Sequence, residues 1–195
     1  MGKFLTEQIR LNNVRLSYCF LVNGRTEEKD GKTTTKFSTQ CLIPYTNTSA
    51  VTRLTEAIEK VKRENRDFFK NKAGNIPHAL KVPKRDGNED DAYAGIETYK
   101  DMWVCNTTSN RRPGIVDRDR QLIDIERLDS EIYSGMWADV LVTISPFEAE
   151  GNKGIAAFIN AVRKKRDDDR IDGTIDATKA FDESDDEDDD GADNI

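Results

Sequence analysis

The sequence contains few cysteines, a single histidine and no long apolar run. Its three cysteines, Cys19, Cys41 and Cys105, lie far apart without the paired spacing of metal ligands, and His78 is the only histidine. A zinc site would therefore need ligands from distant parts of the chain, and we expect none. No stretch approaches the roughly 18 consecutive apolar residues of a membrane span, and the first residues lack the apolar segment of a secretion signal. We expect reduced thiols, no metal, no cofactor, no membrane association and a cytoplasmic protein.

Sequence motifs of the common enzyme classes are missing as well. There is no phosphate-binding Walker loop, no dinucleotide fingerprint, no G-x-S-x-G turn and no HExxH pair. Asp124 and Glu126, in "DIE", are acids that could hold magnesium in a nuclease. Acids without a surrounding motif more often lie on the solvated face of a strand. We expect a protein that is not an enzyme, with a metal-dependent nuclease or recombination enzyme as the alternative.

Charge is distributed unevenly along the chain. The net charge is −7, but nine of the last fourteen residues are Asp or Glu and none is Lys or Arg. Residues 1–181 contain 28 acidic and 30 basic side chains, and residues 1–166 contain 23 and 28. A mildly basic body with an acidic end favours interaction with nucleic acid. We predict one domain at residues 1–181 and a disordered acidic tail at 182–195, because repelling carboxylates bury no apolar surface.

The first third of the sequence predicts strands followed by one substantial helix. Residues 9–22 are rich in strand-forming residues, and residues 36–45 alternate so that Phe37, Thr39, Cys41 and Ile43 share a face. The following helix begins near Thr48 or Ser49 and ends at 71–74. Its apolar residues recur with helical spacing and indicate packing against a sheet: Val51, Leu54, Ala57, Ile58, Val61 and Phe68.

The remaining sequence adds further strands. Residues 98–109 and 136–147 predict strands, residues 121–128 predict a possible strand, and residues 151–166 predict a final strand or helix. The fold class that fits is mainly β with an inserted helix (α+β), as in a small OB-like β-barrel.

One stretch combines aromatic rings with positive charge. A general binder of unpaired strands needs rings on which bases stack and cations that hold phosphates. In a strand, Tyr99 and Trp103 would share a face. Rings in a strand are also common in a protein core, so stacking and core packing are both open. The candidate nucleic-acid-binding residues are Tyr99, Lys100, Trp103, Arg111 and Arg112, with Lys84, Arg85 and Tyr93 from the preceding segment.

Four blocks of the sequence resemble a known family. They are "VRLSYCF", "NRRPGIVD", "YSGMWADVLVTISPF" and "GNKGIAAFINAVRK", which together run from Val14 to about Arg166. In this order they are similar to a bacteriophage family of single-stranded DNA-binding proteins, long classed only as a domain of unknown function. The resemblance implies an OB-like fold, sequence-tolerant binding of single-stranded DNA, and a role in phage DNA replication, recombination or repair in the host cytoplasm.

The acidic tail has a function if the body binds DNA. A tethered polyanion competes with DNA phosphates for the same cations at high effective concentration. The tail also resembles the acidic tips by which replication or recombination proteins are recruited, except that Ile195 replaces the usual aromatic residue. A solubility tail, and a protein–protein module that mimics nucleic acid, are the alternatives. The sequence also leaves a homo-oligomer open. The tail residues concerned are Asp185, Asp186, Glu187, Asp188, Asp189, Asp190 and Ile195.

Overall fold

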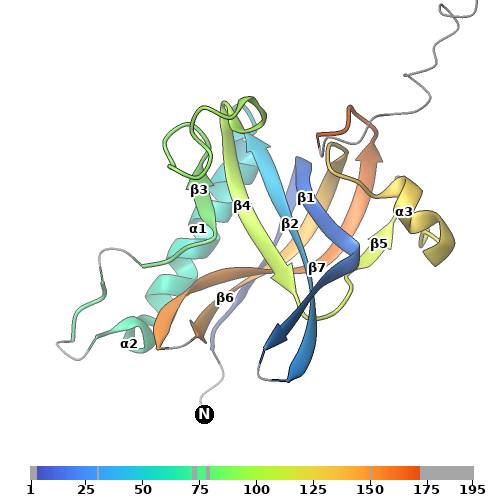
Figure 1. Cartoon of the computed structure of the whole chain (residues 1–195). Coiled ribbons are helices and arrows are strands. Elements are labelled where there is room, and N and C mark those ends of the chain that lie inside the picture. The colour runs from blue at the N-terminus through green and yellow to red at the C-terminus, as the bar shows by residue number, and fades with distance from the viewer. Residues whose placement is uncertain (1–3, 30, 72–73, 78–79, 150, 172–195) are drawn as a thin grey trace, which may run out of the picture.

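The computed structural model describes the chain except for residues 1–3, 30, 72–73, 78–79, 150 and 172–195 (Figure 1). Seven strands and a few helices make up the described part. In chain order the elements are β1 (Glu7–Lys29), β2 (Lys32–Pro44), α1 (Thr48–Glu64), α2 (Arg66–Phe69), β3 (Lys84–Asp86), the 3-10 turn η1 (Glu97–Tyr99), β4 (Met102–Ser109), β5 (Gly114–Val116), the 3-10 turn η2 (Ile125–Arg127), α3 (Leu128–Glu131), β6 (Trp137–Ala149) and β7 (Asn152–Arg166).

Five of the strands close into a barrel. The sheet order is β3-β4-β2-β1-β6-β7-β5, and β4 also pairs with β7. This last pairing is parallel, at Thr107–Ala157 and Thr108–Phe158, whereas the other barrel pairs are antiparallel. The closed path β1-β2-β4-β7-β6 confirms the predicted OB-like barrel, and the last segment, 152–166, is a strand and not a helix.

Alternation along the strands builds the core. On β2, Thr39, Cys41 and Ile43 are 2%, 0% and 0% exposed, so these three members of the predicted face are buried. Cys41 lies opposite Cys105 of β4, and both are free thiols. Burial raises the pKa of the Cys105 thiol to about 12 and also raises that of Cys41. Both thiols therefore stay protonated and pack as small apolar side chains.

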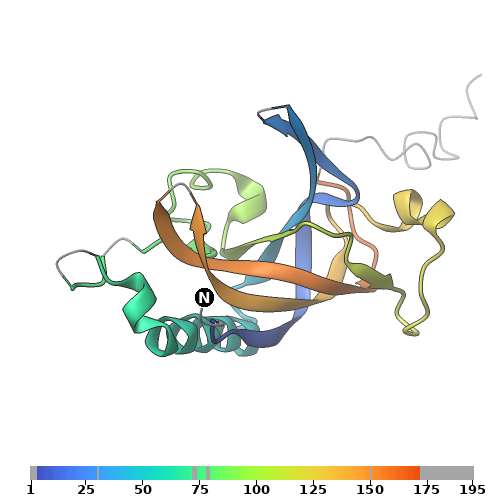
Figure 2. The same cartoon turned by 90° about the horizontal axis from the view of Figure 1, so that it is seen from below.

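Helix α1 covers the barrel on the side opposite the hairpin that joins β1 to β2 (Figure 2). The predicted helix is confirmed, but its cap is Asn47, whose Oδ1 accepts from the Ala50 N–H at 3.3 Å. It also ends earlier than expected, at Glu64, and Asn65 separates it from α2. Its buried stripe contacts β1, β6 and β7 through Ala50, Leu54, Ala57, Ile58 and Val61.

Residues 167–171, called the strap here, fold back from the end of β7 over the start of β6. Trp137 Nε1 donates to Asp168 Oδ2 at 2.7 Å, and the Ile171 N–H donates to the Ser134 carbonyl at 3.1 Å. Gly135 has φ +120°, and a Cβ there would lie 2.1 Å from the Asp169 carbonyl oxygen. Only glycine permits this close approach.

Two local expectations from the sequence are wrong. Residues 121–128 do not form a strand: apart from one bridge between Val116 and Leu122 they lead into η2 and α3. The cause is the Asp117 carboxylate, which accepts from the Asp119 and Gln121 N–H groups and holds a turn. Tyr99 lies in η1 and not in a strand, because β4 begins at Met102.

The stripe of α1 predicts a clear stability effect. Leu54 is fully buried, so Leu54→Ala leaves a cavity between α1 and the barrel and lowers the free energy of unfolding by about 2–5 kcal/mol. Urea unfolding followed by circular dichroism measures the change. Thr52→Ala, at an exposed position of the same helix, is the matched control; equal effects of both substitutions would contradict the packing described.

The strap predicts a transition at acid pH. The hydrogen bond from Trp137, then the Asp169 N–H, Arg15 and Arg166, hold the pKa of Asp168 below its ordinary value. The stabilisation by its charge is complete above the ordinary carboxyl pKa, and is lost as the pH falls through the lowered value. Trp137 fluorescence should therefore change in acid before the far-ultraviolet circular dichroism does. Asp168→Asn should abolish this step; its persistence in that variant would show that other groups hold the strap.

Candidate nucleic-acid interface

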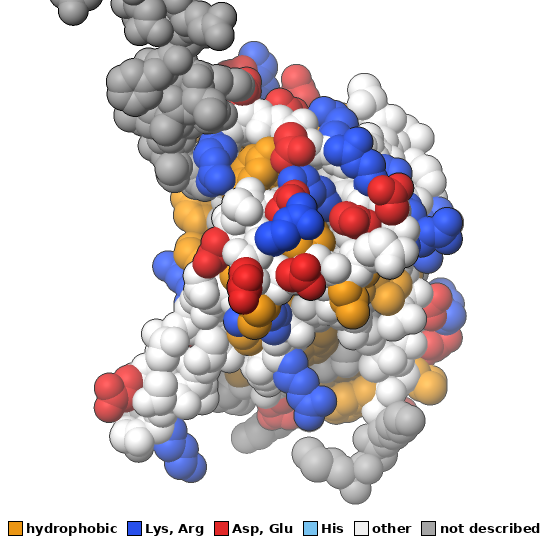
Figure 3. Space-filling model, turned by 90° about the vertical axis from the view of Figure 1, so that its right-hand side faces the viewer, with side chains coloured by type: hydrophobic (Ala, Val, Ile, Leu, Met, Phe, Trp, Pro, Cys, Tyr) orange, Lys and Arg blue, Asp and Glu red, His pale blue; other side chains and the backbone are white. Residues whose placement is uncertain are grey.

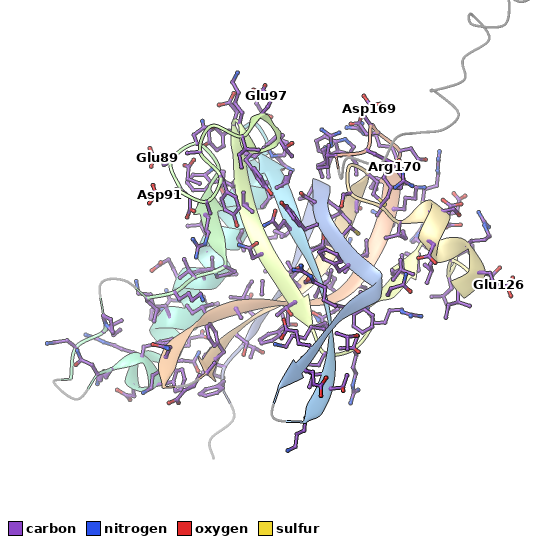
Figure 4. The ribbon with its side chains drawn as sticks, viewed as in Figure 1. Glu89, Asp91, Glu97, Glu126, Asp169 and Arg170 are labelled. Carbon is purple, nitrogen blue, oxygen red and sulfur yellow. The ribbon has the colours of Figure 1, made fainter. Side chains whose placement is uncertain are left out.

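A groove of about 470 Å³ runs across the outer face of β1. One wall comes from the segment around η1 and the other from the strap. In Figure 4 the labelled Glu97 and Arg170 mark these two sides. We call it the β1 groove; it is lined by Ser17, Tyr18, Cys19, Phe20, Ile96, Thr98, Tyr99, Ser134 and Ile171.

A break in the β1 ladder places an aromatic ring at the surface of this groove. The pairing of β1 with β2 shifts between Ser17 and Phe20. Tyr18, within the shift, has φ +46° and is 58% exposed. The Cys19 N–H finds a replacement acceptor in Ser134 Oγ at 3.0 Å. Bulges re-aim side chains, and a tyrosine with positive φ is uncommon enough to suggest a function. An exposed ring in a groove can stack on a planar ligand.

A second ring and a cation follow on the same strand. Phe20 pairs with Ser38 of β2 and lines the groove. The guanidinium of Arg25 lies 4.5 Å from the centroid of the Phe20 ring. Arg25 belongs to the hairpin of β1 and β2 beyond the barrel, residues 23–35, which we call the arm and which projects from the barrel in Figure 2. The groove thus opens toward a cation that lies over an aromatic ring.

The groove wall around η1 is held by two buried, hydrogen-bonded tyrosines. Tyr93 and Tyr99 are 8% and 4% exposed, and their ring centroids lie 4.6 Å apart. Tyr99 OH donates to Gln40 Oε1 at 2.7 Å, and Asn106 Nδ2 donates to Tyr93 OH at 3.1 Å. Burial raises the pKa of Tyr99. Of these two predicted residues, Tyr99 lines the groove and Tyr93 packs behind it.

Tyr99 is the one predicted residue in the groove lining given above, and three of the others lie in and around β3 and β4. Trp103 is partly buried against the core, and Lys84 Nζ lies 3.8 Å from its ring centroid. Lys84 Nζ also donates to Thr55 of α1 at 2.9 Å, and burial lowers its pKa. Arg85 forms an ion pair with Asp90 at 2.9 Å. The expectation that Tyr99 and Trp103 share the face of one strand is therefore wrong, because only Trp103 belongs to β4.

The remaining predicted cations are exposed. Lys100 Nζ lies 3.8 Å from Glu97, a loose pair of two exposed side chains that contributes little. Arg111 and Arg112 lie two and three residues after the end of β4 and are both exposed. The Arg112 guanidinium lies 5.8 Å from the Phe37 ring centroid, near the base of the arm. These three side chains are accessible to a phosphate backbone.

The acids considered for metal binding are elsewhere. Asp124 precedes η2 and Glu126 lies within it; Figure 4 shows Glu126 near α3, away from Glu97. Figure 3 shows Lys and Arg interspersed with Asp and Glu on this side of the molecule. Within the described part of the chain, no cluster of three or more His, Cys, Asp or Glu residues could hold a metal ion. No described helix is long and apolar enough to cross a membrane. The acidic tail residues lie outside the described residues.

Sequence reasoning about rings and charges missed Tyr18, Phe20 and Ser134. The useful signal was present in two of the resembling blocks, "VRLSYCF" and "YSGMWADV". The structure brings them together at the groove, where the Gly135 N–H donates to the Leu16 carbonyl at 2.8 Å. Two of the four blocks that carry the resemblance therefore meet where the groove is built.

The chain is similar to phage proteins of known structure. One is the single-stranded DNA-binding protein from bacteriophage Enc34 in complex with ssDNA, at 23% identity over 84% of this chain and 89% of that chain, with a TM-score of 0.68. A second structure of that protein gives 25% identity, 90% coverage of both chains and a TM-score of 0.63. The gp2.5 single-stranded DNA-binding protein of bacteriophage T7 gives 9% identity, 87% and 97% coverage, and a TM-score of 0.55. No curated protein sequence matches.

A family model covers nearly the whole chain. It is described as "Enterobacter phage Enc34, ssDNA-binding protein" and matches residues 7–191. The description names a binding protein, in agreement with the expectation that the chain is not an enzyme. The chain therefore belongs to the family of the Enterobacter phage Enc34 single-stranded DNA-binding protein.

Proposed function

We propose that this protein binds single-stranded DNA in the β1 groove without strong sequence preference. The observation that carries the proposal is the exposed ring of Tyr18, held by a strained turn at the rim of a groove that also contains Phe20 and Tyr99. Every base has a flat face, so stacking on such rings tolerates any sequence. In support, the family is one of ssDNA-binding proteins, and its Enc34 member has been observed with ssDNA.

The position of the groove on the barrel supports the same function. OB-folds bind oligonucleotides on the face of their second and third strands, between the loops that follow the first and fourth strands. Here β2 and β4 are the second and third barrel strands, and the arm is the loop after the first. The β1 groove lies beside this face, with Tyr99 packed over Leu42 and Val104.

The cations predicted from the sequence have two roles in this proposal. Arg111, Arg112 and Lys100 are exposed and hold phosphates by charge, together with Arg25 of the arm. The other predicted residues do not contact DNA themselves in this proposal. They hold in place the segment that forms the groove wall, and they are Tyr93, Lys84, Arg85 and Trp103. Phosphate contacts of this kind supply affinity without sequence information.

Coating of exposed strands is the biological role that fits this binding. In a phage-infected cell, single strands arise during DNA replication, recombination and repair, and an unspecific binder protects them. The acidic tail then recruits replication or recombination proteins in the host cytoplasm. Family membership supports this role.

The position at which the C-terminal segment leaves the body supports competition between the acidic tail and DNA. The strap ends at Ile171, which itself lines the β1 groove. The following 24 residues, which contain the nine clustered acids, are thus tethered at the rim of the groove. Tethering gives the acids an effective concentration in the millimolar range near the cations. Bound DNA displaces them and makes them available to partners.

Removing the ring of Tyr18 tests the groove. Tyr18→Asn keeps a residue that tolerates positive φ and removes the stacking surface, so affinity for oligo(dT) falls by roughly 1–3 kcal/mol. Fluorescence anisotropy with labelled oligo(dT) measures the change. Tyr18→Trp retains a ring and should bind like the unsubstituted chain.

Leu122→Ser is a matched surface control, since Leu122 is 78% exposed and lies outside the groove. Unchanged affinity of the Tyr18→Asn variant, with intact circular dichroism, would place DNA elsewhere on the protein.

Deleting residues 182–195 tests the tail. If these acids compete with DNA, the deletion tightens binding to oligo(dT), most strongly at low salt where charge is least screened. A salt series with the full-length and shortened chains measures the effect, and duplex DNA is the control ligand. The same affinity for both chains at every salt concentration would remove the competition.

A further inference from the structure

A depression with a charged lining lies on another face of the barrel. Its volume is about 250 Å³, and it is formed by β1, β5, the turn after β5, β6 and β7. It shares no lining residue with the β1 groove. We call it the arginine pocket; its lining includes Arg10, Arg120 and Arg163 with Asp139, Val116 and Leu141.

Two of the three arginines are available to a ligand. Arg163 Nε donates to the Asp139 carboxylate at 3.0 Å, and Asp139 is only 6% exposed. Lys165 Nζ also lies 4.0 Å from that carboxylate. Arg10 and Arg120 are exposed, and neither side chain has an ion pair or hydrogen bond to another described residue. One buried carboxylate thus faces several cations, which leaves the pocket positively charged.

The lining of the pocket favours an acidic peptide over a nucleic acid. Its residues include no aromatic ring, so bases find no surface on which to stack. Apolar side chains such as Val116 and Leu141 lie beside the guanidinium groups. Guanidinium groups pair with carboxylates in bidentate geometry. The matching ligand carries carboxylates next to an aliphatic side chain.

The tail of this chain has that composition. It includes the stretch "DDDGADNI", in which aspartates are followed by the aliphatic Ile195. The 24 residues after Ile171 span at most about 80 Å when extended. Such a tail reaches a neighbouring molecule bound to the same DNA strand.

We infer that the tail tip of one copy, once DNA has displaced it from the β1 groove, docks in the arginine pocket of the next copy along the strand. This inference rests on the proposed function, since DNA both frees the tail and aligns the copies. A tip on one copy and a pocket on the next form a heterologous contact, which propagates as an open chain. Such a contact makes coating of long strands cooperative.

Binding to two lengths of DNA tests the inference with full-length protein. An oligo(dT) of about 12 nucleotides suits one OB fold, whereas one of about 70 holds several copies side by side. Arg10→Gln/Arg120→Gln removes the available charges of the pocket. On the long strand, half-saturation with this variant should require a protein concentration about tenfold higher, or more, than with the unsubstituted chain. On the short strand its affinity should stay unchanged.

Arg63→Gln/Arg66→Gln, at exposed positions outside the pocket, is the charge-matched control and should bind both strands like the unsubstituted chain.

Mixing two defective variants distinguishes contacts between copies from contacts within one chain. The second variant carries Asp188→Asn, Asp189→Asn, Asp190→Asn and Ile195→Ser, so its pocket is intact and its tip is not. An equimolar mixture with the pocket variant should regain part of the cooperativity, because the intact tip of one fits the intact pocket of the other.

Each other outcome overturns the inference. Unchanged long-strand binding by the pocket variant shows that the pocket takes no part. A mixture no more cooperative than its components shows that the tip acts within its own chain or elsewhere. Loss of short-strand binding by the pocket variant makes the pocket a DNA contact instead. Failure of the unsubstituted chain to bind either strand is a different result, which removes the proposed function itself.

Discussion

The break in the β1 ladder is the constraint on which the site depends. β1 pairs with β6 through its first half and with β2 through its second, and then continues into the arm. A regular strand cannot follow both the closed barrel and the projecting arm, so the pairing shifts between Ser17 and Phe20. Ser134 compensates the freed Cys19 N–H, and Tyr18 turns toward solvent. Barrel closure therefore creates the exposed ring, and the strap and the η1 segment complete the groove around it.

The strap separates two populations of carboxylates in the C-terminal region. Asp168 accepts from Trp137, and Arg15 and Arg166 lie 4.0 Å and 3.6 Å from it. Lys164 lies 2.7 Å from both Asp167 and Glu131. These acids are satisfied within the body. The clustered acids of the tail follow only after Ile171, so their charge begins beyond the neutralised strap and beside the groove.

Much of the fold followed from the sequence, and much of the groove did not. The alternation of buried and less buried residues on β2, and the helical spacing of Leu54, Ala57 and Ile58, follow from which side chains face the core. The barrel and α1 were therefore predictable from the sequence. The role of Trp103 was ambiguous, because the sequence does not show that Lys84 lies over its ring. Tyr18 could not be identified from composition, since its exposure results from a register shift between strands far apart in the sequence. Residues 121–128 alternate like a strand but lack a long partner, because the Asp117 turn diverts them.

In the proposed competition for the groove, there is a physical reason why DNA displaces the acidic tail. Both the tail and a DNA strand are polyanions, so the cations of the arm and of the β4–β5 loop attract either one, and salt weakens both. Only DNA also carries rings, and stacking adds about 1–3 kcal/mol per base. None of residues 182–195, which contain the clustered acids, is aromatic, so these residues gain nothing from stacking on Tyr18 or Phe20. In this proposal, charge alone attracts the tail to the groove while no DNA is present, and the aromatic lining lets DNA displace it. A site with cations but no rings gives DNA no such advantage over an acidic peptide, and the arginine pocket is a site of this kind.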